Sequence, residues 1–379
     1  MKFWLLGIIL FFVISNMPFA MAAEAPGPTP GDKYAKGEIV KILIVPGHDD
    51  QKSGAVFRGV READLNFTLA HKIKDMLDKD SSIEVTVSRD EKGYIPELLE
   101  YFDENKKDIE DFIADHKKDT ERFIEKEEPV ISKGVPHNDA PLDVAFKLYG
   151  INKWVDEEDF DFVIHIHFND DASHWGNNMG EYGGFTIYAP EKNLPNSVVS
   201  RPLAEKIGER LRESIPITDL PLEREKADEF GVVPDFTLIA LGSNKTLETP
   251  SILVEYSYIY EPHVRPEFLN LTLQVMARAT ANGVYNYLVE DLVWKNLSYD
   301  WTQVLGITTK KNQDTLALQY ALHELGLYPP INRTREECPF TGILGPCTER
   351  SLKAFQKGVG LEDDGVVGPK TREMLNALF

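Results

Sequence analysis

The sequence lacks the basic character that a nucleic-acid-binding protein needs. Lys and Arg number 41 against 62 Asp and Glu, which gives a formal net charge of -21. Binding to phosphates demands clustered Lys and Arg, so this balance excludes nucleic acid as a partner. It is typical of a soluble protein that stays apart from polyanionic surfaces.

Long apolar runs are equally scarce. One lies at the N-terminus, where Lys2 precedes about a dozen apolar residues and the small residues of a cleavage site follow at 20–22. We therefore predict a signal peptide at residues 1–22 and an exported protein, either periplasmic or secreted and cell-wall associated. An uncleaved membrane anchor is the alternative. No integral membrane span is expected after cleavage, because no second run of this kind follows.

Cysteine is also rare. Cys338 and Cys347 are the only two in 379 residues. In an exported chain this pair favours a disulfide over two free, buried thiols.

Most of the chain alternates apolar runs with helical patterns. Residues 23–38 are rich in Pro, Gly and Ala and predict a flexible linker, after which a large domain is expected at 39–293. Strands separated by helices predict an α/β fold with a mostly parallel twisted sheet and helices on both faces. We predict strands at 41–45, 83–89, 160–168, 183–190, 236–241 and 251–259, and helices at 61–77, 201–215 and 267–293.

Two stretches interrupt this alternation. Residues 101–129, within an insertion at about 101–132, carry many charges of both signs with apolar residues at helical spacing. They predict a solvated amphipathic helix, and a helix that gates the active site is the alternative. Residues 294–312 are predicted as a linker to a separate C-terminal unit at 313–379.

Several residues suited to metal binding follow the predicted strands. His48 comes after the strand at 41–45, and His165 and His167 lie on the same side of the strand at 160–168 because side chains alternate. Glu62 stands at the start of the next helix. The carboxyl ends of such strands meet at one sheet edge, where ligands gather. Two histidines and one carboxylate form a three-ligand set suited to catalytic Zn²⁺, with a fourth position for water.

Zinc chemistry of this kind also needs a residue that moves a proton. Glu255 ends the strand at 251–259 and is the candidate general base and acid for amide hydrolysis. Each candidate has a purely structural alternative. His48 would cap a turn, Glu62 would complement the helix dipole, His165 and His167 would be core histidines, and Glu255 would pair with an arginine.

The ordered motifs resemble the zinc-dependent N-acetylmuramoyl-L-alanine amidases of the amidase-3 family, over roughly residues 40–290. Pro-Gly-His at 46–48, Glu62 before Ala-Asp-Leu-Asn, His-Ile-His-Phe-Asn at 165–169 and Leu-Val-Glu at 253–255 carry the resemblance. It implies a phosphorylase/hydrolase-like amidase fold and a catalytic domain at 39–293. It also implies His48, Glu62 and His167 as metal ligands and Glu255 as the catalytic residue.

The sequence departs from the family pattern at three places. Asp49-Asp50 replace the usual Gly-Gly and bring negative charge that would attract a water or a second cation. His165 replaces the usual serine and would either compete for the metal or assist as a donor. Ser257-Tyr258 follow the catalytic Glu where Gly-Phe is usual, which alters the expected pocket.

The C-terminal unit resembles the type 1 peptidoglycan-binding domain. Residues 342–348 and 365–371 repeat a Gly-x-x-Gly-Pro-x-Thr pattern, in which Gly-Pro ends a turn and Thr caps a helix. A generic helical bundle is the alternative. Three short helices are expected around Leu318, Leu322, Leu352, Phe355, Leu375 and Leu378.

Taken together, the sequence predicts an exported zinc amidase that hydrolyses the bond between N-acetylmuramic acid and L-alanine in peptidoglycan, with glycan strand and stem peptide as its partners. One rival is a non-catalytic peptidoglycan-binding scaffold whose site is spoiled by the departures. The other is a different zinc peptidoglycan hydrolase, either a peptidase or a deacetylase.

Overall fold

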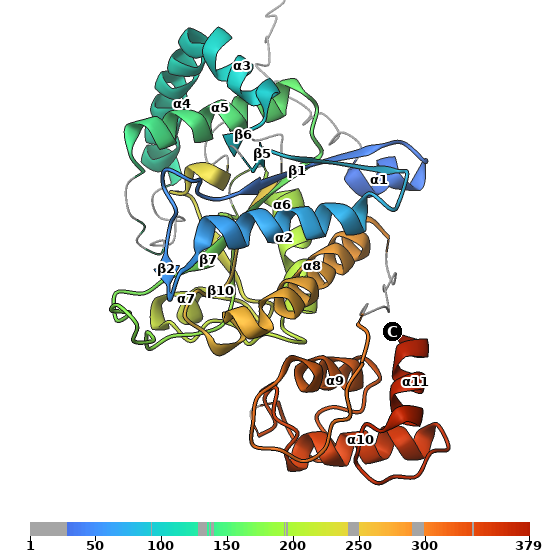
Figure 1. The fold of residues 1–379 in the computed structure, drawn as a ribbon. Helices are drawn as coiled ribbons and strands as arrows, with labels where there is room; N and C mark the ends of the chain where they lie inside the picture. Colours follow the sequence, from blue (N-terminus) through green and yellow to red (C-terminus); the bar gives the residue numbers. More distant parts are fainter. Residues whose placement is uncertain are drawn as a thin grey trace, which may run out of the picture.

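A six-stranded sheet forms the centre of the protein (Figure 1). The computed structural model describes residues 29–379 except 92, 128–134, 136, 138–139, 193, 195, 242–249, 290–298 and 336, so the predicted signal peptide lies outside the described residues. Among the described residues, no helix combines the length and the apolar character that a bilayer crossing needs.

The strand order in the sheet is β4-β1-β7-β10-β8-β9. Four strands run parallel to one another, and β8 and β9 run the opposite way beside β10. This confirms the predicted mostly parallel α/β fold. The strands are β1 (Val40–Pro46), β4 (Ile83–Val87), β7 (Phe162–Asn169), β10 (Ser251–Tyr258), β8 (Thr186–Pro190) and β9 (Val232–Asp235).

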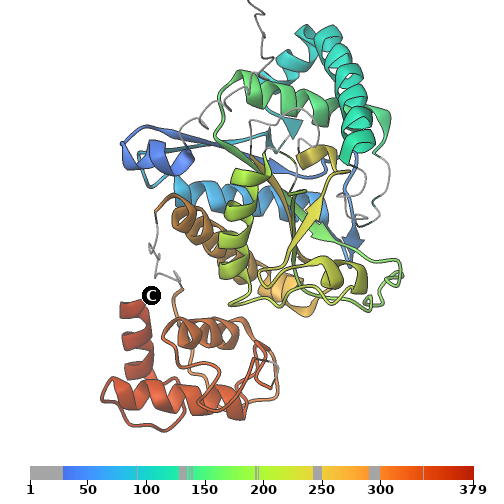
Figure 2. The same cartoon turned by 180° about the vertical axis from the view of Figure 1, so that it is seen from behind.

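Helices cover both faces of the sheet, as predicted (Figures 1 and 2). Along β7, Ile164 and Ile166 pack toward the first helix group and Val163 toward the second, because successive side chains alternate. The same alternation places His165 and His167 on the second face. The first group is α2 (Glu62–Leu77), α6 (Ser197–Leu211) and α8 (Pro266–Leu288), and the second is α3 (Pro96–Glu104), α4 (Lys106–Glu127) and α5 (Leu142–Glu157).

Part of the predicted flexible linker at 23–38 is a helix, so that prediction is wrong for α1 (Pro30–Ala35). Thr29 accepts from the backbone of Asp32, and the Asp32 carboxylate accepts from the backbone of Thr29 in return. Proline fits the first turn of a helix, because the amide that it lacks has no partner there. The helix contacts β1 and α8 and so belongs to the folded domain.

The strand predicted at 236–241 is also wrong. Strand β9 ends at Asp235, whose side chain accepts hydrogen bonds from the backbone of Thr237 at 2.6 Å and of Leu238 at 2.9 Å. This turn diverts the chain into a short 3₁₀ helix, η1 (Ile239–Leu241). The apolar character of the segment reflects burial in η1 rather than strand pairing.

The charged stretch at 101–129 contains the end of α3 and all of α4. The side chain of His116 is buried, and its ring lies 5.4 Å from that of Tyr149 on α5. The structure thus confirms an amphipathic helix, whose apolar side packs on α5. The remaining short elements are β2 (Val56–Phe57), β3 (Val60–Arg61), β5 (Arg89–Asp90), β6 (Gly93–Tyr94), α7 (Pro221–Lys226) and η2 (Pro262–Val264).

The C-terminal unit contains three helices, α9 (Gln313–Glu324), α10 (Pro346–Gly358) and α11 (Pro369–Leu378). Five of its six predicted core residues are buried, but Leu378 is 43% exposed because it lies at the free end of α11. The predicted disulfide between Cys338 and Cys347 is present.

Each repeated turn of this unit is closed by a buried glutamine. Gln319 accepts from the backbone of Gly342 at 2.9 Å and donates to the Thr348 hydroxyl at 2.8 Å. Gln356 forms the equivalent bonds with Gly365 at 2.9 Å and Thr371 at 3.2 Å. The sequence repeat therefore corresponds to a structural repeat.

The linker predicted at 294–312 is wrong in its second part. Residues 294–298 lie outside the described residues, but Trp301 is only 2% exposed and its indole N–H donates to the backbone carbonyl of Asp314 at 3.1 Å. Its hydrophobic cluster also contains Phe268 and Leu271 of α8. The two parts of the protein thus share one apolar core.

Replacing Trp301 tests this shared core. We expect Trp301→Ala to lower the free energy of unfolding of the C-terminal unit by about 3–5 kcal/mol, because it leaves a large cavity. Val304→Ala is the matched control, since Val304 is 61% exposed in the same segment. Hydrogen exchange of the α9–α11 amides under denaturant measures both variants. If both substitutions change the hydrogen-exchange rates by the same small amount, residues 299–312 act only as a tether.

Candidate metal centre

The first residues of the site sit at the end of β1. Gly47 donates its backbone N–H to the Ile166 carbonyl at 2.9 Å, which keeps it beside β7. His48 then adopts a left-handed conformation with φ 64°, a strained state that is frequent at functional sites. A side chain on Gly47 would collide with the ring of His167. Only glycine at this position lets the two histidines approach each other.

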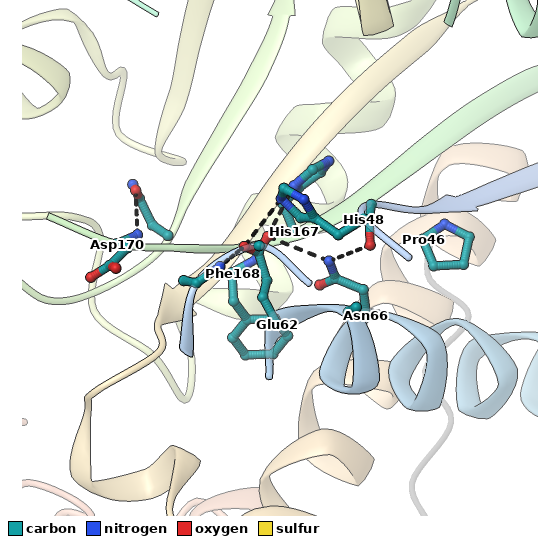
Figure 3. A network of polar contacts seen from close by, with 12 residues as sticks. Pro46, His48, Glu62, Asn66, His167, Phe168 and Asp170 are labelled. Carbon is teal, nitrogen blue, oxygen red and sulfur yellow. Dashed lines mark hydrogen bonds and ion pairs between the residues drawn. The ribbon is translucent and has the colours of Figure 1, made fainter. Parts of the chain in front are cut away.

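Glu62, the first residue of α2, is the centre of the site (Figure 3). Its carboxylate lies 3.2 Å from Nε2 of His48 and 3.1 Å from Nδ1 of His167. The backbone amides of Ala55 and Phe168 donate to it at 3.0 Å and 3.2 Å. One ligand atom from each of the three side chains lies within 4.8 Å of the others. The structure therefore brings together all three residues expected to bind the metal.

The electrostatics of the cluster favour an ionised carboxylate. Burial opposes the ionisation of Glu62, but hydrogen bonds with His167 and His48 outweigh it and hold the pKa of Glu62 well below its usual range. Burial likewise opposes protonation of His48, but the hydrogen bond and the charge of Glu62 raise the pKa of His48. The Glu62 carboxylate is thus kept ionised, which is the form that binds a cation.

Glu255 lies beside the cluster on the neighbouring strand. It is the register partner of His167 across β10 and β7. Its Oε2 atom is buried and has no hydrogen-bond partner among the described residues. Burial and the charges of Glu62 and Glu223 raise the pKa of Glu255 well above its usual range. Glu255 is therefore a carboxyl group whose pKa is shifted upward, toward the range that a general acid and base needs.

His165 lies outside the three-residue cluster. It is 1% exposed, and its Nε2 atom has no hydrogen-bond partner in the described part of the chain. Burial and the neighbouring His167 lower the pKa of His165 to about 3. It is a neutral imidazole in the core, which agrees with the structural alternative for this residue.

The two aspartates after His48 serve the loop that carries it. Asp49 accepts backbone hydrogen bonds from Gln51 at 2.9 Å and Lys52 at 2.8 Å. Asp50 accepts from the Arg61 guanidinium at 2.9 Å. Both carboxylates therefore hold the loop after His48.

Two further residues position the ligands and were not predicted from the sequence. Asn66 donates to the Gly47 carbonyl at 2.9 Å and to the Glu62 carboxylate at 3.4 Å. Its spacing of four from Glu62 places both on one helix face and is a signal that the sequence does contain. Arg89 is 6% exposed and donates to the carbonyl of Ala63 at 2.5 Å. No local pattern identifies Arg89, because its partners lie in other elements.

Glu223 of α7 was not predicted from the sequence either, and it acts on Glu255 rather than on the three ligands. It is 2% exposed and accepts from Thr186 and Tyr188 at 2.7 Å each and from Asn169 at 3.3 Å. Its charge contributes to the raised pKa of Glu255. The sequence around Glu223 reads as an ordinary solvent-exposed helix, so nothing in it indicates a buried carboxylate.

Comparison with known proteins gives the family. A family model described as "N-acetylmuramoyl-L-alanine amidase" matches residues 42–286, which is more than half of the chain. The chain belongs to the N-acetylmuramoyl-L-alanine amidase family. A second model, described as "Putative peptidoglycan binding domain", matches residues 311–375. This amidase-family chain therefore carries a C-terminal unit similar to peptidoglycan-binding domains.

Individual relatives of this amidase-family chain are distant. It is 29% identical over 91 residues to N-acetylmuramoyl-L-alanine amidase AmiC of Escherichia coli O6:H1, and the alignment spans 24% of this chain and 22% of AmiC. Among solved structures, an amidase from Clostridium difficile 630 has a TM-score of 0.41 at 18% identity and covers 66% of this chain and 97% of its own. Ami1 from Mycobacterium smegmatis has a TM-score of 0.42 at 15% identity, and the match covers 67% of this chain and 99% of Ami1.

Two glycines of one hairpin test the packing around Glu62. Gly54 and Gly59 both have positive φ, but a side chain on Gly54 would collide with the Glu62 carboxylate and lie 2.6 Å from the His48 ring, whereas Gly59 faces open space. We expect both alanine variants to lose about 1 kcal/mol of stability from backbone strain.

Only Gly54→Ala should also weaken binding of a divalent ion, by about tenfold or more, because it displaces the carboxylate. Titration with Zn²⁺ against a chromogenic chelator measures this. Equal affinities in the two variants would mean that Glu62 is not a ligand.

Proposed function

We propose that this protein hydrolyses the amide bond between N-acetylmuramic acid and L-alanine in peptidoglycan, as a zinc-dependent enzyme. The observation that carries the proposal is the convergence of two imidazoles and one carboxylate beside Glu255, a half-buried carboxyl group with a raised pKa, in a chain of the amidase family. In this proposal His48, Glu62 and His167 hold the metal, and Glu255 is the catalytic residue.

The donor set fits zinc. Two imidazole nitrogens and one carboxylate oxygen match the catalytic zinc sites that keep a fourth position open. The Gly47 and Gly54 backbones leave room for the three side chains to converge, and Asn66 fixes the carboxylate. When bound, Zn²⁺ would polarise the attacked carbonyl and lower the pKa of water to about 7.

Glu255 supplies the proton transfer in this proposal. Its carboxylate accepts a proton from the attacking water and then donates it to the departing nitrogen of L-alanine. A raised pKa suits this double role, because the group must both gain and release a proton near neutral pH. The orphaned Oε2 atom is the oxygen available for the transfer.

The C-terminal unit holds the enzyme on its polymeric substrate in this proposal, which raises the local substrate concentration. Export, by the predicted signal peptide at 1–22, would bring the protein to the cell wall or the periplasm. We propose a catalytic domain at 39–293 and a peptidoglycan-binding domain at 313–379. Helix α1 also packs on the first domain, and Trp301 also belongs to the core of the second.

Replacing Glu255 tests the catalytic assignment. We expect Glu255→Gln to keep one bound Zn²⁺ and to lower kcat by about a thousandfold, because the amide cannot shuttle the proton. Release of stem peptides with free L-alanine amino termini from purified peptidoglycan, measured by mass spectrometry, is the assay.

Glu84→Gln, at an exposed position of β4, is the control and should behave as wild type. Full activity of Glu255→Gln contradicts the assignment. Products cleaved within the stem peptide, or deacetylated sugars, would instead indicate a peptidase or a deacetylase.

The affinity of the site for Zn²⁺ should decrease as the pH falls. The raised pKa of His48 means that protons compete with Zn²⁺ for its imidazole as the pH falls. We expect affinity to be constant well above that pKa and to fall about tenfold per pH unit below it for each displaced proton. Zn²⁺ titrations between pH 8 and pH 5 measure the slope. A flat profile would exclude His48 as a ligand.

A further inference from the structure

The loop between β7 and β8 is held in a defined shape by its own side chains. Asp171 accepts from the backbone N–H of Ser173 at 2.7 Å, and the Ser173 hydroxyl accepts from the backbone of Glu181 at 2.8 Å. The His174 ring lies 2.7 Å from the Asp170 carboxylate through Nδ1. These bonds join the two ends of residues 170–182, so the loop is a built surface rather than an open connection.

The same loop lies at the rim of the metal centre. It begins three residues after His167 and lies beside β2, as Figure 1 shows. The ring of His174 contacts that of Phe57 at 5.3 Å, and Arg58 donates to the carbonyl of Asn177 at 3.2 Å. Phe57 and Arg58 belong to the hairpin that connects His48 to Glu62. The loop therefore follows the strand that carries His167 and contacts the segment that joins His48 to Glu62.

The loop exposes an aromatic ring to solvent. Trp175 is 65% exposed, and Met179 on the same loop and Val56 on β2 are 42% and 47% exposed. Nearby, Phe57 and Tyr260 are buried, and Tyr182 of the loop is half-buried against the core. An indole exposed on a loop that its own hydrogen bonds hold in shape is suited to contact a ligand, because it offers a flat apolar face and a polar N–H.

We propose that Trp175 is a stacking platform for a sugar ring of the glycan strand. The flat apolar face of a β-linked pyranose matches the face of an indole, whose N–H remains free to bind a polar group. This inference rests on the proposed function and names the part of the substrate that lies on this side of the site.

The charge of the loop distinguishes between the glycan and the stem peptide as possible ligands. Residues 170–182 contain Asp170, Asp171 and Glu181 and no Lys or Arg. The two guanidinium groups that reach the loop are already engaged, Arg58 with the Asn177 carbonyl and Arg265 with the Met179 sulfur. The charges of the loop itself are all negative, which disfavours the free carboxylates of a stem peptide but not N-acetylated sugars without charge. The loop therefore favours the neutral part of the polymer.

Binding of peptide-free glycan tests the subsite without any turnover. The probe is a soluble β-1,4-linked N-acetylglucosamine oligomer added to the full chain, with the ¹⁵N indole resonance of Trp175 assigned by its loss in Trp175→Phe. We expect the oligomer to shift this resonance. In Trp175→Ala, KM for polymeric peptidoglycan should rise about tenfold with kcat nearly unchanged, because stacking contributes to binding rather than to chemistry.

Trp175→Phe should retain part of the affinity, and Val198→Ala, with 73% exposure on α6, should equal the wild type. An unshifted indole together with an unchanged KM overturns the subsite. A shift caused by a stem-peptide fragment and not by the glycan oligomer overturns it as well. If the oligomer shifts Trp175 but no amide cleavage occurs, the subsite stands and the proposed function fails.

Discussion

A buried carboxylate held between two imidazoles is the interaction on which the site depends. Glu62 is 3% exposed, and an isolated charge in that position would be strongly destabilising. His48, His167 and two backbone amides together provide the partners that it needs. His48 follows β1, Ala55 lies before β2, and His167 and Phe168 are both on β7, so the position of this one group fixes the relative placement of β1, α2 and β7.

The sheet topology explains why those segments meet. β1, β7 and β10 are adjacent and parallel, so their carboxyl ends deliver His48, His167 and Glu255 to one edge. The antiparallel β8 then brings Thr186 and Tyr188, which hold the buried Glu223. One consequence is that three carboxylates share a small region. Burial, together with the repulsion from the other two carboxylates, raises the pKa of Glu255 well above that of an exposed glutamate.

The fold class and the main site residues could be predicted because they are encoded locally. Alternating apolar residues define the strands. His48 follows a strand, Glu62 begins a helix, and His167 and Glu255 lie near the carboxyl ends of β7 and β10. Family resemblance chose His167 over His165, and burial of His165 agrees with that choice.

What escaped prediction depends on contacts between distant segments. Arg89 acts through carbonyls on β1 and α2, and Glu223 is buried only because α7 folds against β8. The apolar residues after Asp235 predicted a strand, but the Asp235 side chain binds the backbone that follows it and ends β9 there. The Pro-rich segment before β1 looked featureless, yet a local cap and packing against α8 were enough to order α1.

The apolar core that joins α8 to the C-terminal helices has a mechanical consequence. Phe268 and Leu271 pack with Trp301, and Arg278 of α8 pairs with Glu324 of α9, so residues on both sides of residues 290–298 hold each other directly. With the C-terminal unit fixed to α8 in this way, the distance between the two units is set by packing rather than by a flexible linker. If that unit binds peptidoglycan as proposed, each binding event would expose only a short stretch of polymer to the active site, and cleavage of more distant bonds would require dissociation and rebinding.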